Sequence, residues 1–355
     1  CSKPKTVLIC GDHICVNKNE AEQFFEENLT IEVKIMNNSL IPAFDATRVF
    51  IEPWVLYFES YVWIALMGFF VSSACGVVGC FIILRRMALI GDAISHSILP
   101  GIALAFLVTS SRGSLPMVIG AVLAGMAAVV LIELIQRKCR VKSDAALGVV
   151  FTTLFALGVI LITVWADHVD LDADCVLYGE IAFVPLTEKM SLAGVVIAPV
   201  PVVRMAIVLM TLIACIAYFY KELLVTSFDP VLANTLGIRT WIFHYGLMIA
   251  LSITIVGAFE SVGAILVIAM LIFPGATASL LFQRLPAVLI ASVVFSFLYA
   301  IGGLHLALWL NCSIAGAMAV VGMLLFCCVW IGVLFVREYL HFKNKLCAKE
   351  KTVFS

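Results

Sequence analysis

The feature that most constrains this chain is a series of long segments without acidic or basic side chains. Only 13% of its 355 residues are charged, about half of the roughly 25% that is typical of soluble domains. A helix of about 20 apolar residues crosses the hydrocarbon core of a bilayer. The sequence therefore predicts an all-α, polytopic membrane protein. The candidate spans are 60–84, 87–110, 113–132, 145–166, 205–220, 240–259, 261–283 and 285–336.

These segments predict about nine transmembrane helices, several of them broken by proline or glycine. The last segment is too long for one crossing, and Asn311 divides it into two. If the loop with Arg85 and Arg86 faces the cytoplasm, most of the 22 Lys and Arg residues fall on the cytoplasmic side. Basic residues in short loops favour that side. We therefore expect the N-terminus outside the cell and the C-terminus inside.

Three regions follow one another along the chain. We expect residues 1–53 to form an extracytoplasmic tail, 54–337 a transmembrane domain and 338–355 a basic cytoplasmic tail. Residues 1–35 are polar, and the sequence does not indicate their role. Cys1 reads equally well as the lipid-modified residue of a processed lipoprotein or as a truncated start. The 12 cysteines are scattered and predict no disulfide framework.

The chain lacks the patterns of several functional classes. Its formal net charge is −1, and no basic patch with interleaved aromatic residues is present, so we expect no nucleic-acid partner. The sequence also lacks a GxxxxGK[ST] phosphate loop and the HExxH and GxSxG motifs. We therefore expect no catalytic domain. The energy for any transport has to come from an ion gradient or from another subunit.

Asp92 and His96 are two ionisable residues inside a predicted span. A rise of about 1.5 Å per residue places His96 about 15 Å beyond Arg86, near the middle of a hydrocarbon layer about 30 Å thick. Asp92 lies one turn earlier on the same helix face. Pro100 has no N–H to donate to the carbonyl of His96. Such oxygen and nitrogen ligands suit Mn²⁺, Fe²⁺ or Zn²⁺. The alternative is that the pair only hydrogen-bonds to neighbouring helices.

The polar segment 221–239 predicts a cytoplasmic loop that contains a short amphipathic helix. Asp229 is a favoured N-cap, and Pro230 is favoured at the first helical position. Gly237 is a favoured residue just beyond a helix end. Such a helix either rests on the membrane surface or docks on a partner protein, and both remain open from the residues alone. Its apolar face consists of Val231, Leu232 and Leu236.

The stretch RRMALIGDAISHSILPGIALAFLV, residues 85–108, resembles the signature segment of the membrane permeases of bacterial ABC transporters that import manganese, zinc or iron. Other stretches resemble the same family in the expected order, and together they cover about residues 52–336. These stretches are KSDAALGVVFTTLFALGVILI, VDLDADCVLYGEI, KELLVTSFDPVLANTLGI and FESVGAILVIAMLIFPGATA.

The resemblance implies roles for individual residues. Asp92 and His96 carry over as metal-coordinating residues of the translocation path. Glu260 falls where the family tolerates other residues, and it reads as a metal contact or as a solvated span end. The loop that resembles the ATPase-contacting loop of the family carries Lys221, Glu222, Asp229, Pro230, Leu236 and Gly237.

The resemblance also implies an assembly in the bacterial inner membrane. A permease of this family works with a cytoplasmic ABC ATPase and with an extracytoplasmic metal-binding lipoprotein. It pairs with a second copy of itself or with a related permease. No cofactor is expected to be bound permanently, because the Mn, Zn or Fe ion is the cargo.

Two other classes of function compete with this interpretation. One is a secondary metal carrier, coupled to protons through Asp92 and His96 and working without an ATPase. The other is an intramembrane enzyme or a structural membrane protein, against which the lack of a nucleophile–base or metalloprotease motif argues. Co-purification of an ATPase distinguishes the ABC permease from the secondary carrier. The ligand types do not choose among the metals, since affinity order and cellular availability also decide.

Overall fold

The computed structural model consists mainly of helices, as the uncharged segments predict. It describes residues 45–87, 89–109, 114–139, 141–165, 181–187, 189–192 and 195–353. Within these ranges, eight helices are long and apolar enough to cross a membrane. The helices are α2 (Ala46–Phe50), α3 (Glu52–Leu56), α4 (Phe58–Leu84), α5 (Ile90–Thr109), α6 (Ser114–Cys139), α7 (Ser143–Trp165), the 3-10 helix η1 (Ile181–Leu186), α9 (Val200–Tyr218), α10 (Tyr220–Phe228), α11 (Pro230–Thr235), α12 (Thr240–Val262), α13 (Ala264–Leu281), α14 (Leu285–Leu310) and α15 (Ile314–Val353).

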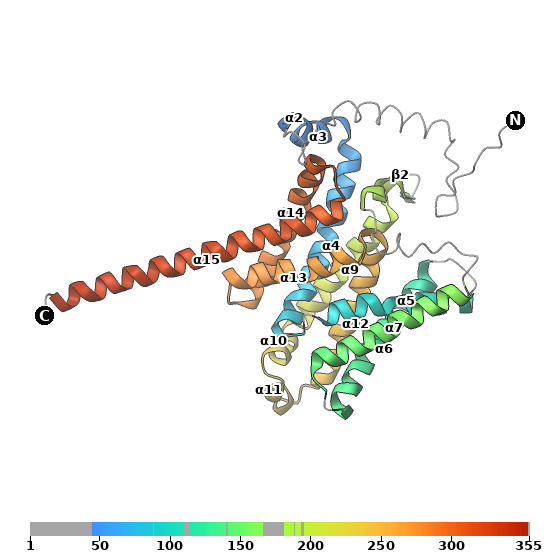
Figure 1. Ribbon diagram of the computed structural model, residues 1–355, viewed down its shortest axis with the longest axis horizontal. Helices are drawn as coiled ribbons and strands as arrows, with labels where there is room; N and C mark the ends of the chain where they lie inside the picture. The colour runs from blue at the N-terminus through green and yellow to red at the C-terminus, as the bar shows by residue number, and fades with distance from the viewer. Residues whose placement is uncertain are drawn as a thin grey trace.

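Helix α4 lies at the centre of the bundle because it is apolar on every face, as expected of a fully buried helix. Its side chains Met67, Val71 and Phe81 are completely buried. Helices α9, α12, α13 and α14 pack against it (Figure 1). A Cβ atom at Gly79 would collide with the backbone carbonyl of Leu271. Glycine at this position therefore lets α13 approach the backbone of α4.

Helix α5, which carries Asp92 and His96, is held between α6 and α7 by glycine contacts. A Cβ atom at Gly101 would collide with the backbone oxygen of Gly120 in α6. On the other side, a Cβ atom at Gly158 of α7 would lie 2.8 Å from the backbone nitrogen of Pro100. Small residues at these crossings allow close backbone packing, which is a usual basis of helix association in membranes.

Replacing Gly101 by Ala is expected to destabilise the bundle by about 1–3 kcal/mol, the usual cost of overpacking. Gly148 of α7 provides the control, because a Cβ atom there meets nothing within 4 Å. Gly148→Ala should leave stability unchanged or raise it, since Ala favours helices by about 1 kcal/mol over Gly. Thermal melting of the detergent-solubilised protein measures both variants. Equal melting temperatures for the two variants would contradict the packing argument.

The predicted span 261–283 differs from the others in length. Gly263, with φ 78°, separates α12 from α13, and such left-handed backbone favours glycine. The apolar part of α13 is then only Leu266–Leu281. The described part of the chain thus has eight full-length candidate spans and one shorter apolar helix, which lies in the predicted span 261–283. The break between α12 and α13 occurs at Gly263. Pro100 and Pro274 lie inside α5 and α13, and both helices continue past them.

A short antiparallel hairpin is an element that the sequence patterns did not indicate. It consists of β1 (Lys189–Leu192) and β2 (Val195–Pro199), with an irregular register between Met190 and Ser191. The ammonium group of Lys189 donates a hydrogen bond to Glu59 Oε1 at 2.8 Å. The hairpin is therefore fixed to the beginning of α4, and helix α9 starts directly after it.

The described part of the predicted N-terminal tail, residues 45–53, belongs to the helical structure. Asp45 caps α2 by accepting a hydrogen bond from the N–H of Thr47 at 3.0 Å. His305 of α14 donates from Nδ1 to the carbonyl of Val49 at 3.0 Å, and its ring lies 4.8 Å from that of Phe50. His305 thus has a packing role at this end of α14.

Helix α15 passes without interruption through the predicted domain boundary at 337–338. Met318 is buried where it packs against Gly303 of α14. Further along, most of the helix extends away from the bundle (Figure 1). Its large apolar side chains are exposed there, including Trp330, Phe335 and Tyr339. The predicted cytoplasmic tail is therefore continuous with the last span.

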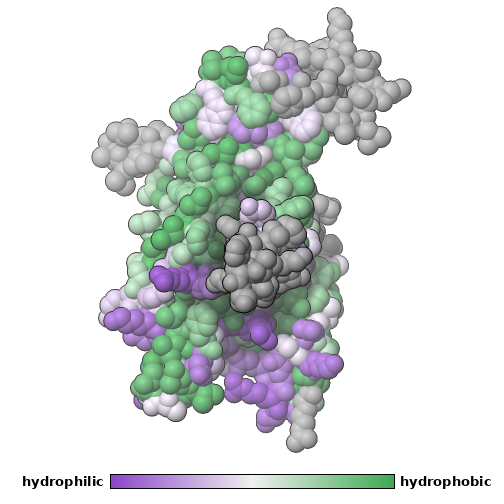
Figure 2. All heavy atoms as spheres, turned by 90° about the vertical axis from the view of Figure 1, so that its left-hand side faces the viewer, coloured by the Kyte–Doolittle hydropathy of each residue, from purple (hydrophilic) through white to green (hydrophobic). Residues whose placement is uncertain are grey.

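The bundle has two distinct ends (Figure 1). Helices α2 and α3 and the hairpin lie at one end, and α10 and α11 lie at the other. Arg85, which follows α4, is hydrogen-bonded to Ser227 of α10 at 3.2 Å. Two loops that were predicted to share the cytoplasmic side therefore do lie at one end. Figure 2 shows hydrophilic residues gathered at this end, below a broad hydrophobic band.

Candidate functional site

Asp92 and His96 lie on the open face of helix α5. Between Ile90 and Gly101, every residue is buried except Asp92, His96 and Leu99, which are half-buried. Spacings of four and three residues place these three side chains on one stripe of the helix. The opposite face of α5 packs into the protein, so its orientation is set by burial of the remaining side chains.

The two ionisable side chains approach each other without a close hydrogen bond. His96 Nε2 lies 3.4 Å from Asp92 Oδ1, beyond the 2.7–3.2 Å range of N–H···O hydrogen bonds in proteins. Their side chains are 31% and 39% exposed, respectively. Lone pairs on both groups are therefore accessible from the same open stripe.

Aromatic rings from α7 flank the imidazole of His96. The ring centroids of Phe151 and Phe155 lie 5.7 and 5.9 Å from that of His96. The hydroxyl groups of Ser95 and Ser97 donate to backbone carbonyls within α5, at 2.8 and 2.6 Å. These serines satisfy their own hydrogen bonds locally and leave Asp92 and His96 as the chemically available groups.

A third protein ligand is not brought to this pair in the described part of the chain. No group of three or more His, Cys, Asp or Glu residues is arranged to hold a metal ion there. Glu260 lies in the last turns of α12, and its side chain is outside the described structure. The segment 169–181, which resembles the outer loop of the family, lies almost entirely outside the described residues. The described residues thus bring two candidate ligand side chains together here, Asp92 and His96.

The predicted helix in the loop 221–239 is present as α11. Oδ1 of Asp229 accepts hydrogen bonds from the N–H groups of Val231 and Leu232, both at 3.0 Å, and Pro230 is the first residue. Gly237, with φ 80°, follows the end, where its N–H donates to the Asn234 carbonyl at 3.1 Å.

The apolar side chains of α11 point outward, while Ala233 is fully buried. Val231 is 74% exposed and Leu236 is 63% exposed. The other loop residues that the sequence singled out, Lys221 and Glu222, lie in the first turn of α10. The structure therefore presents a short capped helix with an uncovered apolar face at the end of the bundle.

A polar cluster that the sequence analysis missed lies beside this helix. His244 of α12 bridges Arg85 and Glu133, which come from the ends of α4 and α6. Sequence reasoning treated Arg85 as a topological marker and gave His244 no role. The sequence feature that could have indicated this cluster is Glu133, the only acidic residue of α6, which lies one turn before Arg137.

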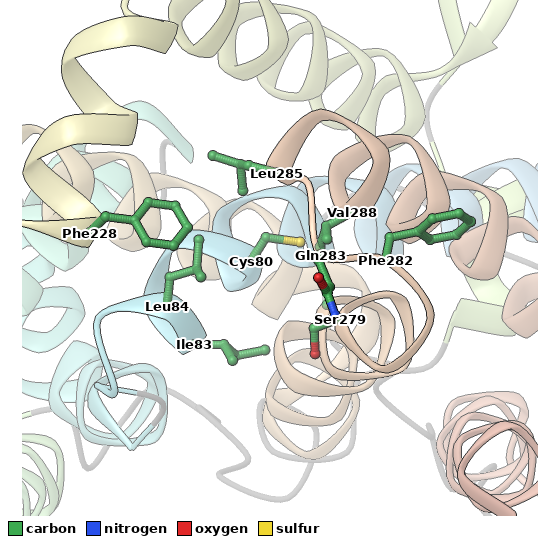
Figure 3. Close-up of a pocket in the computed structure, with 10 residues that line it drawn as sticks. Cys80, Ile83, Leu84, Phe228, Ser279, Phe282, Gln283, Leu285 and Val288 are labelled. Carbon is green, nitrogen blue, oxygen red and sulfur yellow. The ribbon is translucent and has the colours of Figure 1, made fainter. Parts of the chain in front are cut away.

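An apolar cavity of about 280 Å³ lies near the same end (Figure 3). Phe228, the last residue of α10, lines it together with Ile83 and Leu84 from α4. Ser279 and Gln283 contribute polar groups at the end of α13. The cavity contains none of the sequence-predicted site residues, so it is separate from the Asp92–His96 pair.

Comparison with known proteins places this arrangement in a family. The profile of the ABC 3 transport family matches residues 57–333. The manganese transport system membrane protein MntD of Bacillus subtilis is 48% identical over 257 residues, covering 72% of this chain and 86% of that protein. The zinc transport system membrane protein TroD of Treponema pallidum is 45% identical over 268 residues, covering 76% of this chain and 72% of that protein.

A solved structure agrees with these sequence matches. PsaBC from Streptococcus pneumoniae, determined in complex with Fab, aligns with a TM-score of 0.66 and 31% sequence identity. The alignment covers 81% of this chain and 95% of that chain. With the family match over most of its length and eight helices suited to crossing a bilayer, the chain belongs to the ABC 3 transport family: it is a multi-pass permease subunit of the bacterial inner membrane and not an enzyme.

Proposed function

We propose that this chain forms the membrane path of an ATP-driven importer of divalent transition metal ions, and that the ion passes the Asp92–His96 pair. Membership of an ABC transport family supports an ATP-driven permease over a proton-coupled carrier. The relatives named for manganese and zinc transport support a metal cargo. The observation that carries the proposal is the half-exposed Asp92–His96 pair on the open stripe of α5.

The spacing of the pair suits one metal ion. If the ion lies about 2.1 Å from each ligand atom, a separation of 3.4 Å between Asp92 Oδ1 and His96 Nε2 corresponds to an angle of about 108° at the metal. This angle is close to that of a tetrahedral site. With some distortion, it also fits other coordination geometries. One carboxylate oxygen and one imidazole nitrogen suit Mn²⁺, Zn²⁺ or Fe²⁺, and the pair does not choose among these ions.

A carboxylate in a membrane span costs several kcal/mol unless it faces a polar or protein-lined environment. The open stripe of α5 therefore has to face a path rather than lipid. We infer that a second permease, either another copy or a related chain, covers the stripe and closes the path. The remaining coordination positions are filled by water or by groups beyond this chain, which lets the ion leave again.

We further propose that α11 docks on a cytoplasmic ABC ATPase and that an extracytoplasmic metal-binding lipoprotein delivers the ion at the opposite end. The exposed apolar residues Val231 and Leu236 support an apolar docking surface. The basic loops favour the cytoplasm at the end that carries α10 and α11. With this orientation, we expect the N-terminus outside and the C-terminus inside.

Reconstitution of the permease with its co-purifying ATPase tests the proposal. Liposomes that contain both proteins should accumulate radioactive manganese, zinc or iron only when ATP is supplied on the α11 side. A protonophore should leave this uptake intact, because hydrolysis rather than a proton gradient drives it. Uptake that needs a proton gradient and no ATPase would contradict the proposal and would identify a secondary carrier.

A further inference from the structure

The polar cluster at the α11 end connects helices α4, α6, α10 and α12 through Arg85 and His244. The guanidinium of Arg85 donates from Nε to Ser227 Oγ and from Nη2 to Thr226 Oγ1, both at 3.2 Å. Its third nitrogen, Nη1, lies 3.3 Å from His244 Nδ1. Arg85 at the end of α4 is therefore joined to the end of α10 and to the first turns of α12. The planar fork of an arginine provides these separate donors in fixed directions.

His244 extends the connection from Arg85 to a partly buried carboxylate. His244 Nε2 pairs with Glu133 Oε1. Because Arg85 only donates, Nδ1 of His244 has to accept, and Nε2 carries the proton that it donates to Glu133. Neutral imidazole meets both requirements at once, whereas a doubly protonated ring would place an N–H against the guanidinium.

The carboxylate of Glu133 is mostly buried, and both of its oxygens accept hydrogen bonds. Its side chain is 15% exposed, so an unpaired charge there would be costly. Its second oxygen accepts from the Tyr245 hydroxyl at 2.9 Å and from Arg137 Nη2 at 3.1 Å. The side chain of His244 is 20% exposed. We call Arg85, His244 and Glu133 the relay, since each side chain contacts the next through one directional bond.

The relay lies between the docking helix and the helix that carries the metal pair. Thr226 and Ser227, which hold Arg85, come directly before Phe228 and the cap residue Asp229 of α11. The α11 side is also joined to α12, because Thr240 donates to the Asn234 amide oxygen at 3.1 Å. His244 lies one turn beyond Thr240 on α12, so both routes from α11 lead to the relay.

On its other side, Arg85 adjoins a tight turn that leads to α5. Arg86 has φ 57°, a left-handed conformation that costs a non-glycine residue about 1–2 kcal/mol. Backbone bonds from Arg86 to Ile83 at 2.9 Å and from Met87 to Ile82 at 3.0 Å hold this turn. Helix α5 begins at Ile90, and Asp92 is in its first turn. The N–H of Ile90 donates to the carbonyl of Met87 at 3.0 Å, so a displacement of Arg85 reaches Asp92 through a short connection.

The apolar contact between the same segments is looser than the polar one. Phe228 of α10 and Leu84 of α4 both line the 280 Å³ cavity (Figure 3). Because this space is not filled by side chains, apolar packing leaves α10 room to move against α4 on this side. The hydrogen bonds of Arg85 are then the directional link that makes the two segments move together.

We propose that Arg85, His244 and Glu133 are positioning residues that couple movement of α11 to the α4–α5 turn and hence to the Asp92–His96 pair. The inference rests on the proposed function, because it assumes an ATPase at α11 and a metal path along α5. When the ATPase displaces α10 and α11, the relay moves the start of α5, and ATP hydrolysis and ion release occur together. Without the relay, hydrolysis continues and the ion path does not respond.

The test compares His244→Leu with His244→Gln in liposomes that also contain the ATPase, and it measures ATP hydrolysed per manganese ion imported. Leucine removes both relay bonds, whereas a glutamine amide can accept from Arg85 and donate to Glu133. We expect the ratio to rise by about 5- to 150-fold in His244→Leu, the usual range of coupling between sites. His244→Gln should restore it to near the wild-type value. Tyr245→Phe, which removes one donor to Glu133 and leaves the relay bonds, should keep the wild-type ratio.

Arg85→Lys is the second variant and also serves if His244→Leu does not fold. Lysine keeps the charge but cannot replace three fixed donors, so we expect a raised ratio. A wild-type ratio in Arg85→Lys, or an equal ratio in His244→Leu and His244→Gln, would overturn the relay while leaving the proposed function intact. Failure of the wild-type complex to import any metal would overturn the proposed function, and the relay with it.

Discussion

Asp92→Asn is expected to reduce ATP-dependent metal uptake to the level seen without ATP. The substitution keeps the size of the side chain and its capacity for hydrogen bonding but removes the negative charge. A packing role needs only the hydrogen bonds, whereas a metal ligand needs the ionised carboxylate. His96→Gln should have the same effect, because it keeps polarity and removes the imidazole nitrogen. Uptake of radioactive manganese and zinc into reconstituted liposomes measures both.

Ser95→Ala is the matched control for these variants. Ser95 is buried in the same helix turn, and its hydroxyl bonds the backbone carbonyl of Asp92 rather than facing the open stripe. Its uptake should stay within about threefold of wild type, because the lost hydrogen bond goes to the backbone and no metal ligand is removed. Protein level and ATPase association should be unchanged in all three variants. Wild-type uptake in Asp92→Asn would show that the pair only joins helices.

Lower pH should weaken uptake in the wild type. Protons compete with the ion for both ligands, since the metal binds carboxylate and neutral imidazole. Thermal melting of the wild-type protein at each pH separates this effect from a general loss of folding. Uptake that is independent of pH over the acid range would speak against Asp92 and His96 as the ligands.

Replacing both Val231 and Leu236 by glutamate is expected to abolish co-purification of the ATPase and therefore transport. Both side chains are more than half exposed, so charged replacements should cost the fold little. An apolar docking surface, in contrast, would have to bury two carboxylates without partners, which is strongly unfavourable. Affinity purification of the permease, followed by quantification of bound ATPase, measures the outcome. Normal ATPase binding by this variant would mean that α11 only rests on the membrane surface.

The cap of α11 allows a finer comparison on the same helix. Asp229→Ala removes the acceptor for two N–H groups and should destabilise the helix by about 0.5–2 kcal/mol. Asp229→Asn keeps the cap and should behave like wild type. We expect Asp229→Ala to bind ATPase less well than Asp229→Asn, while both reach the membrane. Equal binding would show that the docking surface does not depend on a formed helix.

The elements that could be predicted from the sequence are those whose cause is local. The uncharged segments specify spanning helices, because length and apolarity within one segment decide whether it crosses a bilayer. Asp229, Pro230 and Gly237 specify the limits of α11, because capping involves residues within a few positions of each other. The four-residue spacing of Asp92 and His96 places them on one face of a helix for the same reason.

Tertiary structure alone decided which of these elements meet. Glu133 and His244 are 111 residues apart, and no local pattern indicates that α6 and α12 bring them together. Local patterns also do not indicate that α5 and α6 cross closely at Gly101 and Gly120. Nor do they indicate which face of α5 is buried, leaving Asp92 and His96 on the open stripe. Helix periodicity within one segment defines its faces, whereas the choice of the face that is covered depends on the packing of every other helix.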